Sequence, residues 1–255
     1  LNAVAVDNNK TAFEWGRRAA HAPQIVQNLL NPGQVINFTP RKKQTLDEMV
    51  QRRVAFLTDY QDAAYAQTYL DFVNRVRAAE VKLVSEGVPF TEAVARYLFK
   101  LMAYKDEYEV ARLHTDTAFL QKIKGMFEGD YTLNYHLAPP LIAQTNAKGE
   151  LQKQKFGPLM LTGFKVLKHF KGLRGTAFDI FGNTEERRTE RALIAQYRAS
   201  VEVLLTELNA KNHALAVEIA RVPEQIRGFG HVKARNLAAV RGKWDSLKTQ
   251  WSSLT

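Results

Sequence analysis

The chain has 255 residues, of which 45% are hydrophobic and 24% are charged, so it is long enough for a substantial core in one large or two small domains. It contains no cysteine, which excludes disulfides, thiolate zinc sites, ligation of an iron–sulfur cluster by this chain and a cysteine nucleophile. The formal net charge of +10 favours acidic partners, and its surplus is uneven: residues 1–130 hold 17 Lys or Arg against 16 Asp or Glu, and residues 131–255 hold 19 against 10.

The N-terminal segment is predicted to be helical. Residues 2–20 combine scattered apolar residues with Ala-rich helix formers, and Pro23 interrupts this helix. Residues 24–30 form a predicted short second helix, and residues 31–44, with two prolines, a glycine and three consecutive basic residues, form a predicted linker. Because residues 1–6 already resemble the middle of a helix, we expect the chain to be part of a longer polypeptide.

A long amphipathic helix is predicted to begin at Thr45. Glu48 follows three residues later, the spacing of a capping box, and apolar residues recur at helical spacing as far as Val84. After a Gly-Val-Pro break, Thr91 is predicted to start another helix, and residues 115–127 form a shorter one.

A small antiparallel β element is predicted near residues 131–156. Residues 131–137 alternate between apolar and polar, as in a half-buried strand. Residues 141–144 are predicted to pair with residues 153–156 across a turn at 146–149. Together with the helices, this element predicts a mainly α fold: a multi-helix domain over residues 45–255 that contains one small sheet.

The rest of the chain is predicted to be helical apart from one loop. Pro is tolerated in a first helical turn, and Thr is a good N-cap, so both mark helix starts here. The predicted segments are a helix opened by Pro158, a loop over 172–183, a helix capped by Thr184, a neighbouring helix over 212–222 and a final helix over 233–254.

Patterns of known catalytic or metal sites are missing from the sequence. No two of the six histidines lie three or four residues apart, and there is no nucleophile elbow, Walker phosphate loop or dinucleotide glycine fingerprint. The carboxylate pairs at 106–107 and 185–186 are interpreted as solvated helix faces. We therefore predict no catalytic residue and no metal ligand in this chain.

Two loops combine glycine, arginine and an aromatic residue, at 171–182 and 226–233. Glycine allows close backbone approach to a ligand, and a nearby cation can hold a phosphate or carboxylate, so Arg174, Arg227 and Lys233 are candidate anion contacts. The alternative is that these loops only connect helices, with glycines supplying positive φ and phenylalanines anchoring the loops on the core.

Basic residues gather in the same half of the chain. Lys165, Lys168 and Lys171 are candidate partner contacts, and scattered surface charge is the alternative. No signal peptide and no apolar run of membrane-spanning length occur, so we expect no membrane association and a cytoplasmic location.

Residues 1–6 read Leu-Asn-Ala-Val-Ala-Val, and residues 12–20 read Ala-Phe-Glu-Trp-Gly-Arg-Arg-Ala-Ala. These two stretches resemble the closing helix of the γ-like domain in the 2-oxoacid:ferredoxin oxidoreductase family, so residues 1–30 are expected to be the end of that catalytic domain. Residues 45–255 resemble the extra C-terminal domain of the fused bacterial indolepyruvate ferredoxin oxidoreductases. The stretches that carry this second resemblance are 53–61, 96–113, 136–140, 173–176, 212–216 and 226–233.

The resemblance implies a role beside an enzyme. In the parent enzyme that the resemblance implies, an aryl 2-oxoacid is oxidatively decarboxylated, coenzyme A accepts the acyl group, and ferredoxin accepts the electrons. Thiamine diphosphate, Mg and 4Fe–4S clusters are its implied cofactors, none of them bound by this chain. Its expected partners are the remaining domains, ferredoxin and further copies of the parent in a homo-oligomer.

On this reading the chain is a non-catalytic accessory domain, inactive alone. The candidate anion contacts would meet the phosphates of coenzyme A, and the candidate lysines would meet an acidic ferredoxin. The alternative, based on charge alone, is a basic helical nucleic-acid-binding module, although no recognised binding signature is present.

Overall fold

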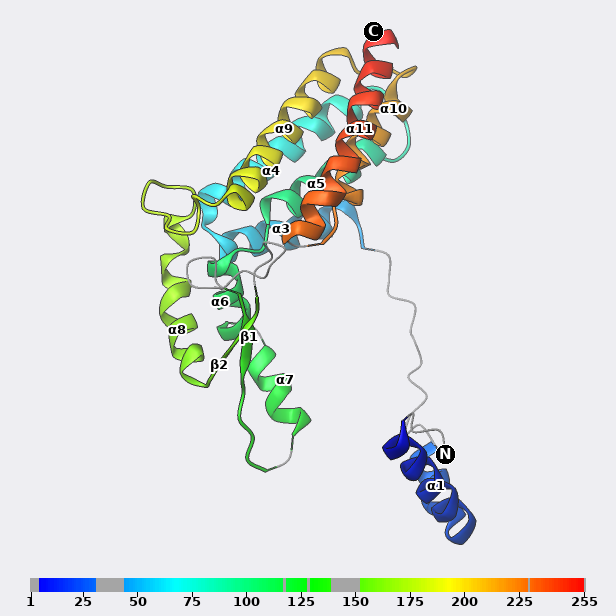
Figure 1. The fold of residues 1–255 in the computed structure, drawn as a ribbon. Helices are drawn as coiled ribbons and strands as arrows, with labels where there is room; N and C mark the ends of the chain where they lie inside the picture. The colour runs from blue at the N-terminus through cyan, green and yellow to red at the C-terminus, as the bar shows by residue number, and fades with distance from the viewer. Residues whose placement is uncertain are drawn as a thin grey trace. The chain divides into compact units, whose positions relative to one another are not determined.

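The computed structural model describes residues 5–30, 44–116, 118–127, 129–138, 152–228 and 230–254, and it confirms the mainly α fold (Figure 1). The chain divides into two compact units, residues 1–44 and 45–255. The first contains α1 (Val6–His21) and α2 (Pro23–Leu30), close to the predicted bounds, and no side chain of α1 is buried. The predicted linker lies outside the described residues except for Gln44. Nowhere in the described ranges is a helix both long and apolar enough to cross a membrane.

The second unit starts with the predicted capping box. Thr45 and Glu48 each accept a backbone N–H of the other at the start of α3 (Leu46–Tyr60). The prediction of one helix as far as Val84 was wrong, because the chain breaks after Tyr60 and restarts as α4 (Ala63–Glu80). The cause is Asp62, whose carboxylate accepts the backbone N–H of Tyr65 at 2.7 Å and caps the new helix.

The next three helices differ from prediction at their starts. They are α5 (Pro89–Met102), α6 (Glu107–Thr115) and α7 (Phe119–Met126). Thr91 does not begin α5: its hydroxyl and backbone N–H donate to the buried carboxylate of Glu80, which also receives a hydrogen bond from His213. The helix α6 was not predicted separately, and Asp106 caps it.

The described sheet pairs two segments that were predicted from the sequence to be strands but not to pair with each other. β1 (Tyr135–Leu137) pairs antiparallel with β2 (Gln154–Phe156), with Tyr135 opposite Phe156. The predicted partner, 141–144, lies outside the described residues. Tyr135 is buried and its ring packs edge-on against Phe164, 5.4 Å away between centroids, so the half-buried face expected of the first strand holds the sheet in place.

The remaining elements follow the predicted order, and the Thr184 cap is confirmed because its hydroxyl accepts the N–H of Arg187. The predicted loop begins with a 3₁₀ turn. The elements are α8 (Leu159–Leu167), the 3₁₀ helix η1 (Lys168–Leu173), α9 (Glu185–Glu207), α10 (His213–Arg221), the 3₁₀ helix η2 (Val222–Gln225) and α11 (Gly230–Leu254).

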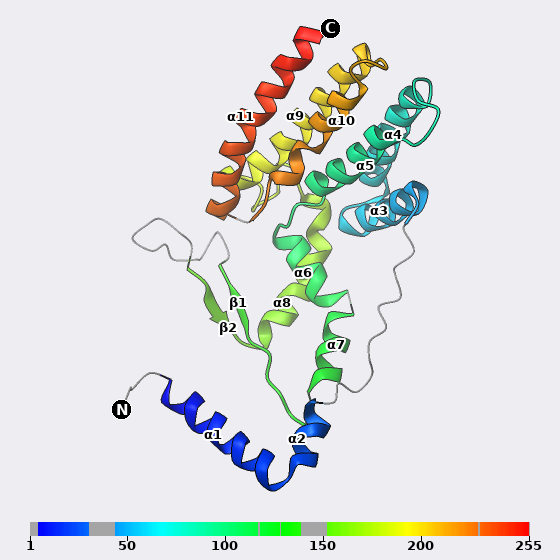
Figure 2. The same ribbon diagram turned by 90° about the vertical axis from the view of Figure 1, so that its right-hand side faces the viewer.

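The main core lies where α3, α4, α5, α9, α10 and α11 meet, and Figures 1 and 2 show α4, α5, α9, α10 and α11 side by side. Buried tyrosines cross-link this bundle: Tyr69 of α4 donates to the carbonyl of Ala95 in α5, and Tyr197 of α9 to that of Ala220 in α10, each at 2.9 Å. A smaller core joins α6, β1 and α8. The connection between the two cores contains the candidate site.

Candidate functional site

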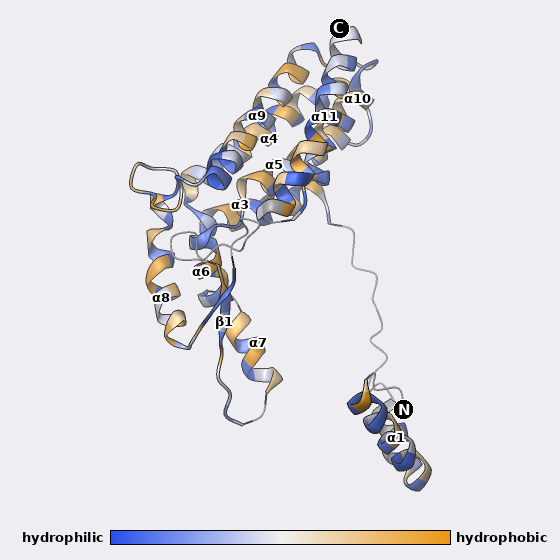
Figure 3. Cartoon of the chain, in the orientation of Figure 1, coloured by the Kyte–Doolittle hydropathy of each residue, from blue (hydrophilic) through white to orange (hydrophobic). Residues whose placement is uncertain are grey.

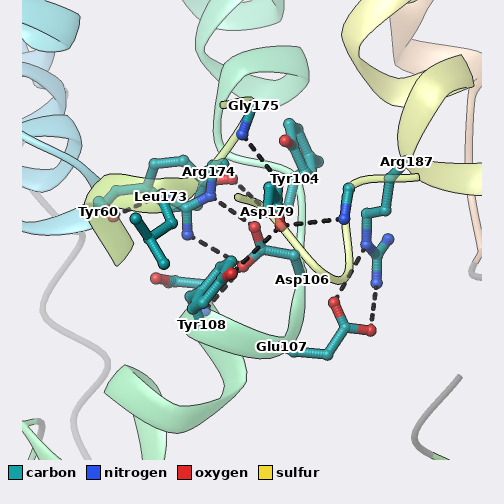
Figure 4. Close-up of polar contacts among 12 residues, drawn as sticks. Tyr60, Tyr104, Asp106, Glu107, Tyr108, Leu173, Arg174, Gly175, Asp179 and Arg187 are labelled. Atoms are coloured by element: carbon teal, nitrogen blue, oxygen red, sulfur yellow. Dashed lines mark hydrogen bonds and ion pairs between the residues drawn. The ribbon is translucent and has the colours of Figure 1, made fainter. Parts of the chain in front are cut away.

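A buried ion pair between Asp106 and Arg174 joins two distant parts of the chain (Figure 4). Oδ2 of Asp106 accepts a hydrogen bond from Nε of Arg174 at 2.5 Å, and Oδ1 accepts one from Nη2 at 3.0 Å. Both side chains are only 3% exposed. Oδ1 also accepts the N–H of Glu109 at 2.8 Å, so one carboxylate fixes both the start of α6 and the segment after η1.

The guanidinium of Arg174 has further partners at the end of α3. Its Nη1 donates to the carbonyl of Tyr60 at 2.7 Å, and its Cζ lies 3.7 Å from the centroid of the Tyr60 ring. Burial by itself lowers the pKa of Arg174, but the hydrogen bonds and charge of Asp106 outweigh burial and raise that pKa above its ordinary value. Arg174 is therefore a permanent cation with internal partners.

A second buried carboxylate, that of Asp179, closes the loop that follows. It accepts hydrogen bonds from the hydroxyl of Tyr108 at 3.2 Å and from the backbone N–H groups of Gly175 at 2.8 Å and Gly182 at 3.0 Å. Gly175 has φ +76°, a conformation that favours glycine. The loop over 174–182 is thus held from inside by two aspartates (Figure 4).

The interpretation of residues 106–107 as a solvated pair was wrong. Asp106 is buried, and Glu107 binds Arg187 of α9, with Nη2 3.1 Å from Oε1. The reason is that the start of α6 packs against the loop and against α9, which carry Arg174 and Arg187. The other pair, Glu185 and Glu186, is exposed as expected.

A hollow of ≈ 500 Å³ lies beside Arg174. Its walls come from the α3–α4 junction, the segment between α5 and α6, the loop after η1, and α9. The lining residues are Gln61, Tyr65, Tyr104, Arg174, Gly175, Arg191, Ile194, Ala195 and Arg198. We call this feature the arginine hollow.

Two arginines of α9 give the arginine hollow its positive charge. Arg191 donates from Nη2 to the carbonyl of Gly182 at 2.7 Å, and Arg198 lies with Cζ 4.9 Å from the ring centroid of Phe72. Neither forms an ion pair with any residue that the structure describes. Burial raises the pKa of Tyr104, so its phenol stays protonated and neutral at this wall.

The three predicted anion contacts occupy different surroundings. Arg174 is buried against Asp106, as described above. Lys233 pairs with the buried carboxylate of Glu190 at 2.6 Å, and Arg227 is exposed. Arg227 and Lys233 both lie near Lys100, whose pKa is lowered by burial and by these two cations. The sequence pattern singled out the loop that contains Arg174, but it did not identify Asp106 and Tyr60 as the partners of this arginine.

The three predicted partner contacts also differ from one another. Lys165 is exposed on α8. Lys168 pairs with Asp116, and Lys171 donates to the carbonyl of Asp59 at 2.6 Å. Lys165 is thus the one whose ammonium has no hydrogen bond or ion pair with a residue in the described ranges.

Large apolar side chains are exposed along α8 and the loop after η1. Leu159 is 86% exposed and Phe178 is 77% exposed, whereas Phe181 packs edge-on against Tyr108 at 5.4 Å between ring centroids. The expectation that phenylalanines anchor this loop holds for Phe181 and not for Phe178. The members of this apolar surface are Leu159, Val166, Phe170, Phe178 and Ile180.

The apolar surface continues into a shallow hollow at the start of α8. This hollow measures ≈ 380 Å³ and is lined by Phe156, Gly157, Pro158, Leu159, Met160 and Gly163. Figure 3 shows α8 mainly in the colours of hydrophobic residues. Large apolar side chains that are exposed to solvent in number are typical of interaction sites.

The described residues contain no group of three or more His, Asp or Glu side chains arranged to hold a metal ion. Residues 46–246 match the model of a family described as "Family of unknown function (DUF6537)". No curated protein and no solved structure matches the chain.

Proposed function

The chain belongs to the DUF6537 family, and we propose that it is a non-catalytic docking domain of a larger thiamine diphosphate-dependent aryl 2-oxoacid:ferredoxin oxidoreductase. The observation that carries the proposal is the apolar surface on α8 and the following loop. Burying Leu159, Phe178 and Ile180 against a partner would remove apolar area from water, the main favourable contribution to association. The occupant we assign to this surface is the catalytic part of the parent enzyme.

The loop that carries Phe178 and Ile180 is well suited to docking because it is already ordered from inside. Asp106 and Asp179 hold both of its ends through buried hydrogen bonds. An ordered loop loses less conformational entropy on binding than a flexible one, so more of the apolar burial remains as affinity.

The resemblance to the oxidoreductase family supports the same proposal. Tyr60, Asp106 and Arg174 all fall within the stretches that carry it, and these residues hold the fold together. The resemblance therefore concerns a shared scaffold. The 4Fe–4S clusters of the parent do not fit this chain, because a sequence without cysteine cannot supply thiolates to them. We propose that these clusters, thiamine diphosphate and Mg are bound by the remaining domains.

The nucleic-acid alternative is less well supported because many basic side chains already have acidic partners. Lys168 pairs with Asp116, and Lys233 pairs with Glu190. Cations used in this way add little to a phosphate-binding face. A titration with RNA at physiological salt is the test of this alternative, and tight binding with a steep salt dependence would favour it over docking.

Photocrosslinking tests the docking proposal directly. A photoreactive phenylalanine is placed at position 178 of the chain within the parent enzyme, and in a matched control at Val203, which is exposed on α9. We expect position 178 to crosslink to peptides from the thiamine-binding or cysteine-bearing segments, and position 203 not to. Equal crosslinking at both positions, or none at position 178, would contradict the proposal.

A further inference from the structure

Three side chains of α9 form one wall of the arginine hollow. Arg191, Ala195 and Arg198 recur at intervals of four and three residues, so they lie on one side of the helix. Both arginines are half-buried and have no carboxylate partner in the described ranges. A partly desolvated cation without a counter-charge is unfavourable, and an incoming anion relieves that cost.

Neighbouring carboxylates compensate only part of this charge. Asp106 is bound to Arg174, and Asp179, whose hydrogen-bond donors are all uncharged, lies near Nη1 of Arg191 beside Gly182. Arg198 has no such carboxylate beside it in the described ranges. Glu202, one turn beyond Arg198 on α9, pairs with Arg75 instead. The arginine hollow therefore keeps an excess of positive charge.

The opposite wall is polar and aromatic and carries no negative charge. Tyr65 donates its hydroxyl hydrogen to the carbonyl of Met102 at 2.9 Å, which fixes the ring at the edge of the hollow. Gln61 adds an amide at the same wall, and Ile194 adds an apolar patch on the α9 side. This arrangement offers cations for one end of a ligand and ring or aliphatic contacts for the other.

We propose that the arginine hollow binds an organic phosphate, with its phosphate group between Arg191 and Arg198 and its uncharged part against Tyr65 and Ile194. Guanidinium groups match the geometry of phosphate oxygens and can bind them through paired hydrogen bonds. A phosphate monoester carries a charge of about −1.5 to −2 at neutral pH, close to that of two arginines. The volume of ≈ 500 Å³ lies in the range of small-molecule sites and leaves room for more than the phosphate group.

Calorimetric titration of the 255-residue chain at low salt tests the proposal with three probes: phenyl phosphate, inorganic phosphate and phenol. We expect phenyl phosphate to bind more tightly than either of the others, because only this probe contacts both walls. Failure of phenyl phosphate to bind, or inorganic phosphate binding as tightly, would overturn the proposal.

Two variants and two matched controls locate the binding. Arg198→Gln removes a cation from the hollow, and Ala195→Glu adds a carboxylate to its wall, so each should weaken the binding of phenyl phosphate about tenfold or more. Arg188→Gln and Gln196→Glu change the charge of α9 equally at exposed positions that do not line the hollow. Their binding should equal that of the unaltered chain.

The urea midpoint of each variant shows that it is folded at the temperature of the titration. Ala195 is exposed, so its substitution leaves the core intact and keeps the test valid even where Arg198→Gln destabilises the chain. Equal weakening by the hollow variants and by their controls would overturn the proposed site. The result does not depend on a parent enzyme, so it separates this site from the docking proposal.

Discussion

The carboxylate of Asp106 binds Arg174, which lies 68 residues further along the chain, and at the same time caps the helix that begins beside it. The pair holds the α6 start, the end of α3 and the loop before α9 in one arrangement. Because that loop carries the exposed Phe178, the ion pair connects the stability of the fold to its proposed docking surface.

Asp106→Asn should destabilise the chain strongly. The amide keeps the size of the carboxylate but leaves the buried Arg174 cation uncompensated, a change that costs about 3–5 kcal/mol. The measurement is the urea midpoint at unchanged m-value. Asp47→Asn is the control, because Asp47 forms an exposed pair with Arg77, and such pairs contribute about 0–1 kcal/mol. Similar midpoints for the two variants would show that the Asp106–Arg174 pair is not a major support of the fold.

Gly182→Ala should also destabilise the chain. A Cβ at this position would lie 2.6 Å from Cγ of Asp179 and 3.1 Å from Nη1 of Arg191, so the loop must shift. Overpacking of this kind costs about 1–3 kcal/mol. In Gly125→Ala, on α7, the new Cβ meets nothing within 4 Å, and removing a helical glycine should stabilise by about 0.5–1 kcal/mol. Thermal unfolding of both variants checks the opposite signs.

Stability should fall at alkaline pH because of buried tyrosines. Burial raises the pKa of Tyr197 well above its ordinary value, so the folded chain keeps this proton where the unfolded chain has lost it. Above about pH 10 the unfolded state binds fewer protons than the folded state, and the free energy of unfolding decreases with pH. Below about pH 10 Tyr197 is protonated in both states, so its contribution to the free energy of unfolding does not change with pH.

Tyr197→Phe isolates this effect. At about pH 8 the substitution should cost about 1 kcal/mol, because it removes the hydrogen bond to the carbonyl of Ala220. At about pH 11 the difference in free energy of unfolding between the unaltered chain and the variant should shift by about 1.4 kcal/mol in favour of the variant. Urea titrations at both pH values measure the shift, and a difference that does not change with pH would contradict the assignment.

Lys165→Glu should slow electron transfer from the parent enzyme to ferredoxin at low ionic strength if the docked domain guides ferredoxin. The ammonium of Lys165 is exposed, so its reversal leaves the fold intact, whereas Lys168 and Lys171 already have internal partners. The rates should converge at high salt because surface charges are screened. Lys122→Glu is the control, because Lys122 is exposed on α7. If both reversals slow electron transfer equally, the effect comes from the net charge of the chain, and Lys165 does not guide ferredoxin.

Features with a local cause were predictable from the sequence. The caps at Thr45 and Thr184 depend on residues three positions away, and both were identified. Asp62 caps α4 by the same chemistry, but apolar residues continue at helical spacing across it, and this periodicity concealed the break. When a capping residue lies inside a continuous apolar pattern, the composition of the sequence does not show that the helix breaks there.

The ion pairs were not predictable because they depend on the tertiary fold. The Gly-Arg-aromatic pattern singled out the loop that contains Arg174, yet nothing in the sequence indicates that its counter-ion is Asp106. The spacing of Arg191 and Arg198 on one helix side is visible in the sequence, but the opposite wall of the arginine hollow comes from residues 61–104. Only the packing of α4 and α5 against α9 brings these walls together.

The composition of the native assembly tests the docking proposal most directly. The chain is isolated from its source cells with an antibody, and thiamine diphosphate and iron are measured per mole of chain in the purified material. We expect both in stoichiometric amounts, carried by the catalytic part to which the apolar surface is bound. Native chain that is isolated without thiamine diphosphate and without iron would contradict its role as a docking domain of a 2-oxoacid:ferredoxin oxidoreductase.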